Sequence, residues 1–439
     1  MKNYFKLFGI IALAAIIVFS FIACNSDPES SDTAVTFSSL SANGNLTTTT
    51  TSLTLTFSKA IEGLTDANIT LGGDAAITKG SLSGSGPSYT LGVTVTRAGT
   101  VTVSVSKSGY AISGSLKSTI AYRKIDWAAA SFINTDDIAA IAWSGSRFVV
   151  GTRTNANIAY SPNGNDWTLV TTNPFTSPSD RVQSIAWGGN KFVAVARYGQ
   201  MAYSSNGETW TSITPSPFGT ADNSAQSITW GGAAGNEKFV AGGQKTKITY
   251  SSDGITWPDP TTNPAEELYT HPTSGTSHYV NNLTWGGPAG NQKFIAACFY
   301  GLTGNVGGGL YQSTDGVSWT LISGTEGDTA AQAYNGVVWG GPSGAEKFIA
   351  CSDNGIIYST DGITWTAASS PITTALRNIA WGGDRFIAVG ASGKMAQSAD
   401  GITWTEITDH GLTGTIYDIT YGNNKFVACG VSGGIAYTE

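Results

Sequence analysis

The sequence predicts an all-β protein, a seven-bladed β-propeller preceded by a small β-sandwich. The motif Ser-x-Asp/Asn-Gly-x-x-Trp occurs six times between residues 161 and 404, at intervals of roughly 40–60 residues, which indicates a repeat architecture. A second motif, an aromatic residue and glycine followed by Lys or Arg and Phe, occurs seven times. Glycine accounts for 55 of 439 residues and charged residues for only 12%, a composition typical of β proteins with many tight turns.

Residues 1–23 have the pattern of an export signal. Two lysines precede an uncharged apolar run from Leu7 to Ala23, and such a leader is excluded from the folded domains. The run ends in Phe-Ile-Ala-Cys24, which resembles a bacterial lipobox. This resemblance implies that Cys24 carries a lipid and anchors the chain in the cell envelope, at the outer membrane or the cell surface. An uncleaved N-terminal helix is the alternative, and residues 24–34 are expected to form a flexible tether.

Residues 35–122 contain neither motif and are expected to form a separate unit. Apolar residues alternate with polar ones in three segments, Leu53–Phe57, Tyr89–Val95 and Val101–Val105, with the period of half-buried strands. Short strands separated by glycine-rich turns over this length predict a β-sandwich. The segments Leu53–Phe57, Ile69–Gly72 and Val101–Tyr110 resemble the bacterial Ig-like modules of surface lipoproteins and adhesins.

Each repeat is expected to form four short strands. In the second repeat these are Ser184–Trp187, Lys191–Ala196, Met201–Ser204 and Thr209–Ile213, separated by turns that contain glycine or asparagine. Four strands in each repeat predict a propeller blade, which buries both faces of its sheet against the neighbouring blades.

The last repeat stops before its Asp-Gly-x-x-Trp motif, and the missing strand occurs at the start of the repeat region. Residues Ile125–Ser131 match Ile363–Ser369, both with a tryptophan at the third position. We therefore expect residues 124–131 to pair beside Gly434–Thr438 and to close a propeller of residues 123–439. Closure removes the two open sheet edges that otherwise favour aggregation.

The six Ser-x-Asp/Asn-Gly-x-x-Trp copies resemble the Asp-box, or BNR, repeats of sialidases, some xyloglucan-cleaving enzymes, sortilin-type receptors and photosystem assembly factors. They are a shortened variant, with one residue fewer between Asp and Trp. The resemblance implies that the Asp or Asn of each copy is structural, with its side chain hydrogen-bonded to the backbone of its own turn. These residues are Asn163, Asn206, Asp253, Asp315, Asp361 and Asp400.

Several function classes find little support in the sequence. The net charge is −7 and no cluster of Lys and Arg occurs, which argues against nucleic-acid binding. No Gly-x-Ser-x-Gly or phosphate-loop motif occurs in the repeats. Two histidines, seven residues apart, lack metal-ligand spacing, so no metal or other cofactor is predicted. Cys298, Cys351 and Cys429 are expected to be buried apolar residues rather than disulfide partners.

Two insertions mark a candidate ligand site. Pro258–Tyr279 and Phe299–Gly309 are expected on the propeller face that carries the more variable loops. The candidate ligand-binding residues are Tyr269, His271, His278, Tyr279, Phe299 and Tyr300; plain exposed loops are the alternative. We expect the propeller to bind a protein or glycan at the cell surface, with the lipid anchor as its only membrane contact. The alternatives are an envelope assembly factor and a glycoside hydrolase of sialidase-like fold.

Overall fold

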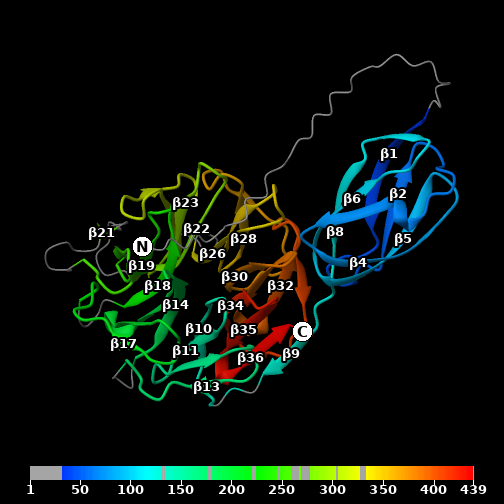
Figure 1. Cartoon of the computed structure of the whole chain (residues 1–439). Helices are drawn as coiled ribbons and strands as arrows, with labels where there is room; N and C mark the ends of the chain where they lie inside the picture. Colours follow the sequence, from blue (N-terminus) through cyan, green and yellow to red (C-terminus); the bar gives the residue numbers. More distant parts are fainter. Residues whose placement is uncertain are drawn as a thin grey trace, which may run out of the picture.

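The structure, a computed structural model, divides the chain into a two-sheet unit and a ring of four-stranded sheets (Figure 1). It describes residues 32–130, 132, 134–175, 180–219, 224–245, 247–258, 266–267, 277–302, 305–326 and 333–438. Cys24 and most of the expected tether lie outside these residues. Within the described ranges, no helix has both the length and the apolar character needed to cross a membrane.

The first unit, which we call the first domain, packs two sheets on one apolar core. Its five-stranded sheet has the order β4-β5-β2-β1-β7 and its three-stranded sheet the order β3-β6-β8. The alternating residues of Leu53–Phe57, Tyr89–Val95 and Val101–Val105 are buried in this core, as the sequence predicts. The strands are β1 (Thr33–Ala42), β2 (Ser52–Phe57), β3 (Ile69–Gly73), β4 (Ala76–Ser83), β5 (Ser88–Arg97), β6 (Gly99–Val105), β7 (Tyr110–Ser113) and β8 (Leu116–Ala121), and η1 (Asp66–Asn68) is a 3-10 turn.

The ring contains seven four-stranded antiparallel sheets among the described residues. The first strands, nearest the ring axis, are β10 (Ile138–Trp143), β14 (Val182–Gly188), β18 (Ala225–Gly231), β22 (Ser277–Gly286), β26 (Tyr334–Gly340), β30 (Leu376–Gly382) and β34 (Ile416–Gly422). The second strands are β11 (Phe148–Thr152), β15 (Lys191–Ala196), β19 (Lys238–Gly243), β23 (Lys293–Leu302), β27 (Lys347–Ser352), β31 (Arg385–Gly390) and β35 (Lys425–Gly430).

The third and fourth strands lie farther out. The third are β12 (Ile158–Ser161), β16 (Met201–Ser204), β20 (Lys247–Ser251), β24 (Asn305–Ser313), β28 (Gly355–Ser359), β32 (Met395–Ser398) and β36 (Ile435–Thr438). The fourth are β13 (Thr168–Leu169), β17 (Thr211–Ser212), β21 (Glu266–Glu267), β25 (Thr320–Leu321), β29 (Thr366–Ala367), β33 (Thr405–Ile407) and β9 (Trp127–Ala130). The short 3-10 turns η2 (Arg197–Gly199), η4 (Ala391–Gly393) and η5 (Val431–Gly433) connect second strands to third strands.

The chain closes the ring on itself. The first strand of each sheet contacts the first strand of the next sheet, and β34 contacts β10. Strand β9 pairs antiparallel with β36, with Ile435 opposite Ala130 and Thr438 opposite Trp127. The sheet that contains the last described residue therefore receives its outer strand from the start of the repeat region, the pairing that the match between the two segments predicts.

Glycine allows the sheets to pack this closely. Near the end of each first strand, an aromatic residue contacts the preceding sheet. It lies against the glycine that follows the corresponding aromatic residue there, as in the pairs Gly340–Trp381 and Gly422–Trp143. A Cβ atom at either glycine would overlap the aromatic side chain. Six of the seven sheets make this contact; in the first, Ser144 follows the aromatic residue. The first glycine of the Gly-Gly motif therefore serves packing between sheets rather than only the turn.

We expect Gly340→Ala to lower the free energy of unfolding by about 1–3 kcal/mol, because the added methyl group must displace Trp381. The matched control is Gly355→Ala, since nothing lies within 4 Å of a Cβ there and its φ is not in the left-handed region. Urea denaturation of both variants measures the difference. Equal stability of the two variants would show that the contact between sheets is not a packing constraint.

The six turns of the Ser-x-Asp/Asn-Gly-x-x-Trp motif share one hydrogen-bond pattern. In the turn of Asp361, the Oδ1 atom accepts hydrogen bonds from the backbone N–H groups of Ile363 and Thr364, and from the Ser359 hydroxyl. The carboxylate or amide oxygen of the other five residues accepts the same three bonds. Partial burial alone would raise the pKa of Asp253, but the hydrogen bonds in its turn lower it to about 2.

A buried arginine joins the first domain to the ring. The side chain of Arg385 is fully buried, and its guanidinium donates to the backbone oxygens of Leu46 and Arg123 at 2.9 and 2.6 Å. It also donates to both carboxylate oxygens of Asp384 and to Gln397 Oε1. The first domain therefore docks on the face of the ring that carries the repeated turns, and that face is not free there.

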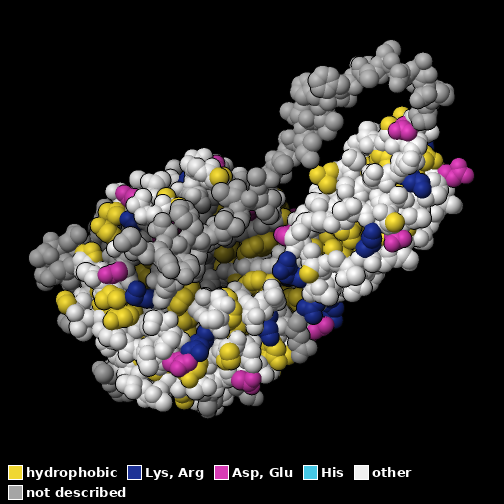
Figure 2. All heavy atoms as spheres, viewed as in Figure 1, with side chains coloured by type: hydrophobic (Ala, Val, Ile, Leu, Met, Phe, Trp, Pro, Cys, Tyr) yellow, Lys and Arg dark blue, Asp and Glu magenta, His cyan; other side chains and the backbone are white. Residues whose placement is uncertain are grey.

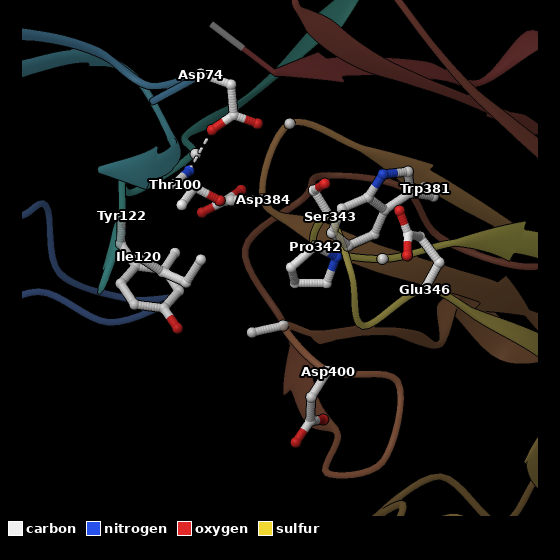
Figure 3. A pocket seen from close by; sticks show the side chains of 14 residues that line it. Asp74, Thr100, Ile120, Tyr122, Pro342, Ser343, Glu346, Trp381, Asp384 and Asp400 are labelled. Carbon is white, nitrogen blue, oxygen red and sulfur yellow. Dashed lines mark hydrogen bonds between the residues drawn. The ribbon is translucent and has the colours of Figure 1, made fainter. Parts of the chain in front are cut away.

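The surroundings of Arg385 include a pocket of about 400 Å³ between the two parts (Figure 3). Asp74 and Tyr122 line it from the first domain, while Trp381, Glu346 and Asp400 are among the residues that line it from the ring. The contact between the two parts is therefore not continuous.

We expect Arg385→Lys to loosen the docking, because an ammonium group cannot reproduce the planar set of five hydrogen bonds. The free energy of unfolding should fall by about 2 kcal/mol or more, and trypsin should cleave faster after Arg123 and Lys124. The control is Arg147→Lys, at the same repeat position but in contact with Tyr160 and Glu208 instead. Unchanged cleavage of the linker in Arg385→Lys would contradict this role.

Candidate functional site

A β-bulge interrupts the first strand of every sheet in the ring. The pairing register between the first and second strands skips one residue near the start of each first strand, for example Gln183 in β14 and Arg377 in β30. A bulged residue has no partner in the ladder, and its side chain is turned out of the regular alternation. The seven skipped residues are Ala139, Gln183, Gln226, Asn281, Asn335, Arg377 and Tyr417.

All seven of these residues line one cavity of about 560 Å³ at an end of the ring axis. We call this cavity the channel mouth. Arg153, Asp353, Tyr279, Phe299 and Thr415 complete its lining. It opens on the face that carries the loops between the second and third strands, opposite the face on which Arg385 binds the first domain.

Carboxamide side chains form one side of the channel mouth. Gln183 Nε2 donates to Gln226 Oε1 at 2.7 Å, and Asn281 Nδ2 donates to Asn335 Oδ1 at 3.1 Å. A carboxamide has two donor hydrogens and an acceptor oxygen. Asn281 Nδ2 also donates to the Tyr334 oxygen, and Asn335 Nδ2 donates to Asp353 and to the Leu376 oxygen, so the asparagines keep acceptor capacity only. The two glutamines keep both donors and acceptors for a ligand.

Two arginines form the other side. The Arg377 Nη1 atom lies 3.5 Å from Asp353 Oδ1, which also accepts a 2.7 Å hydrogen bond from Asn335. The Arg153 guanidinium lies 4.4 Å above the centre of the Tyr417 ring, and the described residues place no carboxylate within ion-pair distance of it. The channel mouth thus combines two cations with one carboxylate that is already hydrogen-bonded.

Two of the six candidate ligand residues lie in the channel mouth. Tyr279 in β22 is the cross-strand partner of Phe299 in β23, and their rings stack with centroids 6.3 Å apart. His278 and Tyr300 are the adjacent cross-strand pair, and their side chains lie outside what the structure describes. Tyr269 and His271 also lie outside the described residues.

The two expected loop insertions are partly strand. Strands β23 and β24 each extend several residues beyond their counterparts, so much of Phe299–Gly309 is a longer hairpin rather than a loop. Within the other insertion, Glu266–Glu267 forms the fourth strand of the third sheet. In five other sheets that strand starts directly after the tryptophan of the Ser-x-Asp/Asn-Gly-x-x-Trp motif. Here Pro258 comes next, and proline has no N–H for the ladder.

The candidate ligand residues selected from the sequence did not include the seven bulge residues, nor Arg153 and Asp353. The bulge positions can be located in the sequence by their spacing. Each one stands four positions before the aromatic residue of the second motif, as Gln183 does before Trp187 and Arg377 before Trp381. This position varies between Ala, Gln, Asn, Arg and Tyr within an otherwise regular repeat.

Half-buried polar side chains lie next to the bulge residues in the first strands of the sixth and seventh sheets. Asp418 follows the bulge residue Tyr417, and its carboxylate accepts hydrogen bonds from the backbone of Ile141 and Ile419 and from the Asn378 amide. Ile141 belongs to the neighbouring sheet, so Asp418 ties the last sheet to the first. Burial raises the pKa of Asp418 to about 6, although these hydrogen bonds oppose the shift.

Because the pKa of Asp418 is raised from 3.8 to about 6 on folding, the folded protein keeps a proton that the unfolded chain loses. The free energy of unfolding should therefore decrease as the pH rises from about 4 to about 6, by about 3 kcal/mol from this group. Asp418→Asn removes the effect, so the stability of the wild type relative to this variant should fall across that range. Denaturation at pH 4.5 and pH 7 measures it, with exposed Asp126→Asn as the control; parallel pH profiles for wild type and Asp418→Asn would contradict the assignment.

Few titratable groups occur among the described residues that line the channel mouth. Its one carboxylate, Asp353, is bound by Asn335 and Arg377. Among the described residues, no group of three or more His, Cys, Asp or Glu side chains could hold a metal ion. The thiols of Cys298, Cys351 and Cys429 are free and buried, and burial raises the pKa of all three. The arrangement is suited to binding a polar ligand.

Known structures with a similar fold are β-propellers. No family model and no curated protein matches the sequence. YCF48 bound to a D1 peptide aligns with a TM-score of 0.53 and 17% identity, over 72% of this chain and 97% of that one. Virginiamycin B lyase from Staphylococcus aureus aligns with a TM-score of 0.52 and 15% identity, over 72% of this chain and 98% of that one. The WD40 propeller domain of Doa1 aligns with a TM-score of 0.51 and 12% identity, over 72% of this chain and 97% of that one. At these identities the likeness shows the fold alone, a β-propeller.

Proposed function

We propose that this chain is an exported recognition protein of the cell envelope whose propeller binds an exposed segment of another protein at the channel mouth. In this proposal the leader of residues 1–23 is removed and Cys24 carries the lipid anchor. Residues 24–34 are the tether, residues 35–122 form the Ig-like domain, and residues 123–439 form a seven-bladed propeller. The seven four-stranded sheets and the pairing of β9 with β36 support the number of blades and their closure.

The observation that carries the binding function is the convergence of the seven bulge residues on one cavity. Their neighbours in each strand are fixed by packing between sheets, whereas the bulge residues differ from sheet to sheet. Gln183, Gln226, Asn281 and Asn335 present amide groups, which match the alternating N–H and C=O groups of an extended polypeptide. Tyr279 and Phe299 add an aromatic wall that provides contact area at small entropic cost.

The position of the first domain agrees with this assignment. It occupies part of the face that carries the Asp-box turns, and it leaves the channel mouth open on the opposite face. Strand β1 (Thr33–Ala42) starts at the end of the first domain away from the ring (Figure 1). An anchored chain would therefore hold the channel mouth away from its point of attachment.

One similar structure is a propeller, YCF48, bound to a D1 peptide, which agrees with a peptide ligand and with the alternative that this chain assists the assembly of other envelope proteins. A glycan is the other ligand class, because carboxamides and an aromatic wall also suit sugar hydroxyls and rings. The glycoside hydrolase alternative has less support, since such enzymes generally use two carboxyl groups and the described mouth presents only Asp353.

The test compares peptide and glycan arrays probed with residues 25–439, the proposed mature protein without its lipid-bearing Cys24. We expect peptide binding, and we expect the double variant Gln226→Ala/Asn281→Ala to weaken it by about tenfold or more, since each lost hydrogen bond contributes about 1 kcal/mol. Asn236→Ala, an exposed change on the opposite face, is the control. Binding only to glycans, or peptide binding that survives the double variant but not Asn236→Ala, would refute the proposal.

A further inference from the structure

A second cavity, of about 260 Å³, lies where the first domain meets the ring. We call it the junction pocket. Its lining comes from the end of β5 and the following turn (Thr96–Ala98), from the linker (Arg123 and Ile125), and from the turns after β30 and β34 (Gly382–Asp384 and Tyr421–Phe426). Lys and Arg side chains gather on the surface at this junction (Figure 2). The pocket belongs to neither part alone.

The lining of the junction pocket is positively charged, in a chain whose net charge is −7. Arg97, Arg123 and Lys425 contribute three cationic side chains. Among the described residues of the lining, only Asp384 carries a carboxylate, and both of its oxygens accept hydrogen bonds from Arg385 at 2.8 Å. Asp384 and Arg385 therefore neutralise each other, and Arg97 and Lys425 bring positive charge to the pocket from the first domain and from the ring.

Neither Arg97 nor Lys425 has a carboxylate partner among the described residues. Arg97 donates one hydrogen bond, of 2.6 Å, to the backbone oxygen of Asp74. The Lys425 ammonium lies 4.8 Å above the centre of the Tyr437 ring. A guanidinium has five N–H donors and an ammonium has three, so both groups keep donors for a ligand.

Cations of like sign that face one partly enclosed space repel each other, and an anion in that space would offset the repulsion. Arginine forks and lysine ammonium groups are suited to tetrahedral oxyanions, and Asn423 and Asn424 add neutral donors at the rim. The volume lies below the roughly 300–1,000 Å³ of pockets for drug-sized ligands. It suits a phosphate group that is free or carries a small substituent.

We propose that the junction pocket binds a phosphate group, and that the bound phosphate holds the first domain on the ring. The ligand contacts Arg97 from the first domain, Arg123 from the linker and Lys425 from the ring. A lipid headgroup is the less favoured source of the phosphate. The chain enters the first domain at Thr33, and the ten residues of β1 separate Thr33 from the other end of that strand by about 30 Å. A free or soluble phosphate is the favoured source.

The experiment titrates the mature protein with inorganic phosphate at constant ionic strength, with chloride as the matched salt. We expect phosphate to raise the melting temperature and to slow tryptic cleavage of the linker, while chloride does neither. Arg97→Gln/Lys425→Gln should weaken phosphate binding, measured by calorimetry, by about tenfold or more, because it removes two charge-assisted contacts. The control, Lys59→Gln/Lys191→Gln, removes the same charge elsewhere, with Lys191 at the repeat position of Lys425.

Equal stabilisation by chloride, or equal phosphate affinity in the two double variants, would overturn the proposal. If the Arg97→Gln/Lys425→Gln protein is unfolded, the single variant Lys425→Gln provides the same comparison with Lys191→Gln. Vesicles that contain phosphatidic acid distinguish the sources. Binding to vesicles that inorganic phosphate displaces would assign the site to a headgroup, and binding to phosphate alone would assign it to a soluble ligand.

Discussion

The close contact between a glycine in one sheet and an aromatic ring in the next is the constraint on which the ring depends. A ring of sheets must be narrow at its axis, so the first strands approach each other more closely than ordinary side chains allow. Gly188 receives Trp230, Gly382 receives Tyr421, and Gly422 receives Trp143 from the first sheet. The last of these contacts closes the circle, because it joins sheets that are far apart in sequence.

This constraint also explains where the chain is free to vary. The aromatic residue, the glycine and the phenylalanine that follows them are committed to packing, and Phe386 and its counterparts are fully buried. The Asp and Asn side chains of the repeated turns are hydrogen-bonded within those turns, as the bonds of Asp361 show. The bulge releases one residue in each first strand from both requirements. Variation collects there, and symmetry brings all seven positions to one cavity.

The first domain docks where the sixth sheet departs from the repeat. At the third-strand position where other sheets have Tyr160, Tyr250 or Tyr437 beneath a cation, the sixth sheet has Gln397. The Gln397 side chain accepts a hydrogen bond from Arg385, and the adjacent Asp384 orients the guanidinium. Arg385 is thereby held with its remaining donors toward Leu46 and Arg123. The fourth sheet also has glutamine at this position, Gln312, which accepts a hydrogen bond from Lys293. The contact between domains therefore depends on the arginine as well as on the loss of the stacking tyrosine.

The amino-acid sequence by itself determined the all-β class, the four-strand repeat and the pairing of the segment at Trp127 with the end of the chain. Local periodicity and turn residues encode these features within each repeat, and neighbouring repeats supply the same burial. It also pointed to Tyr279 and Phe299, because the third and fourth sheets carry added length. Only the tertiary structure assembled the channel mouth and the junction pocket. Each cavity joins single residues from sheets, turns and a linker that are distant in sequence, and their proximity depends on the curvature of the ring and on the docking through Arg385 rather than on any local pattern.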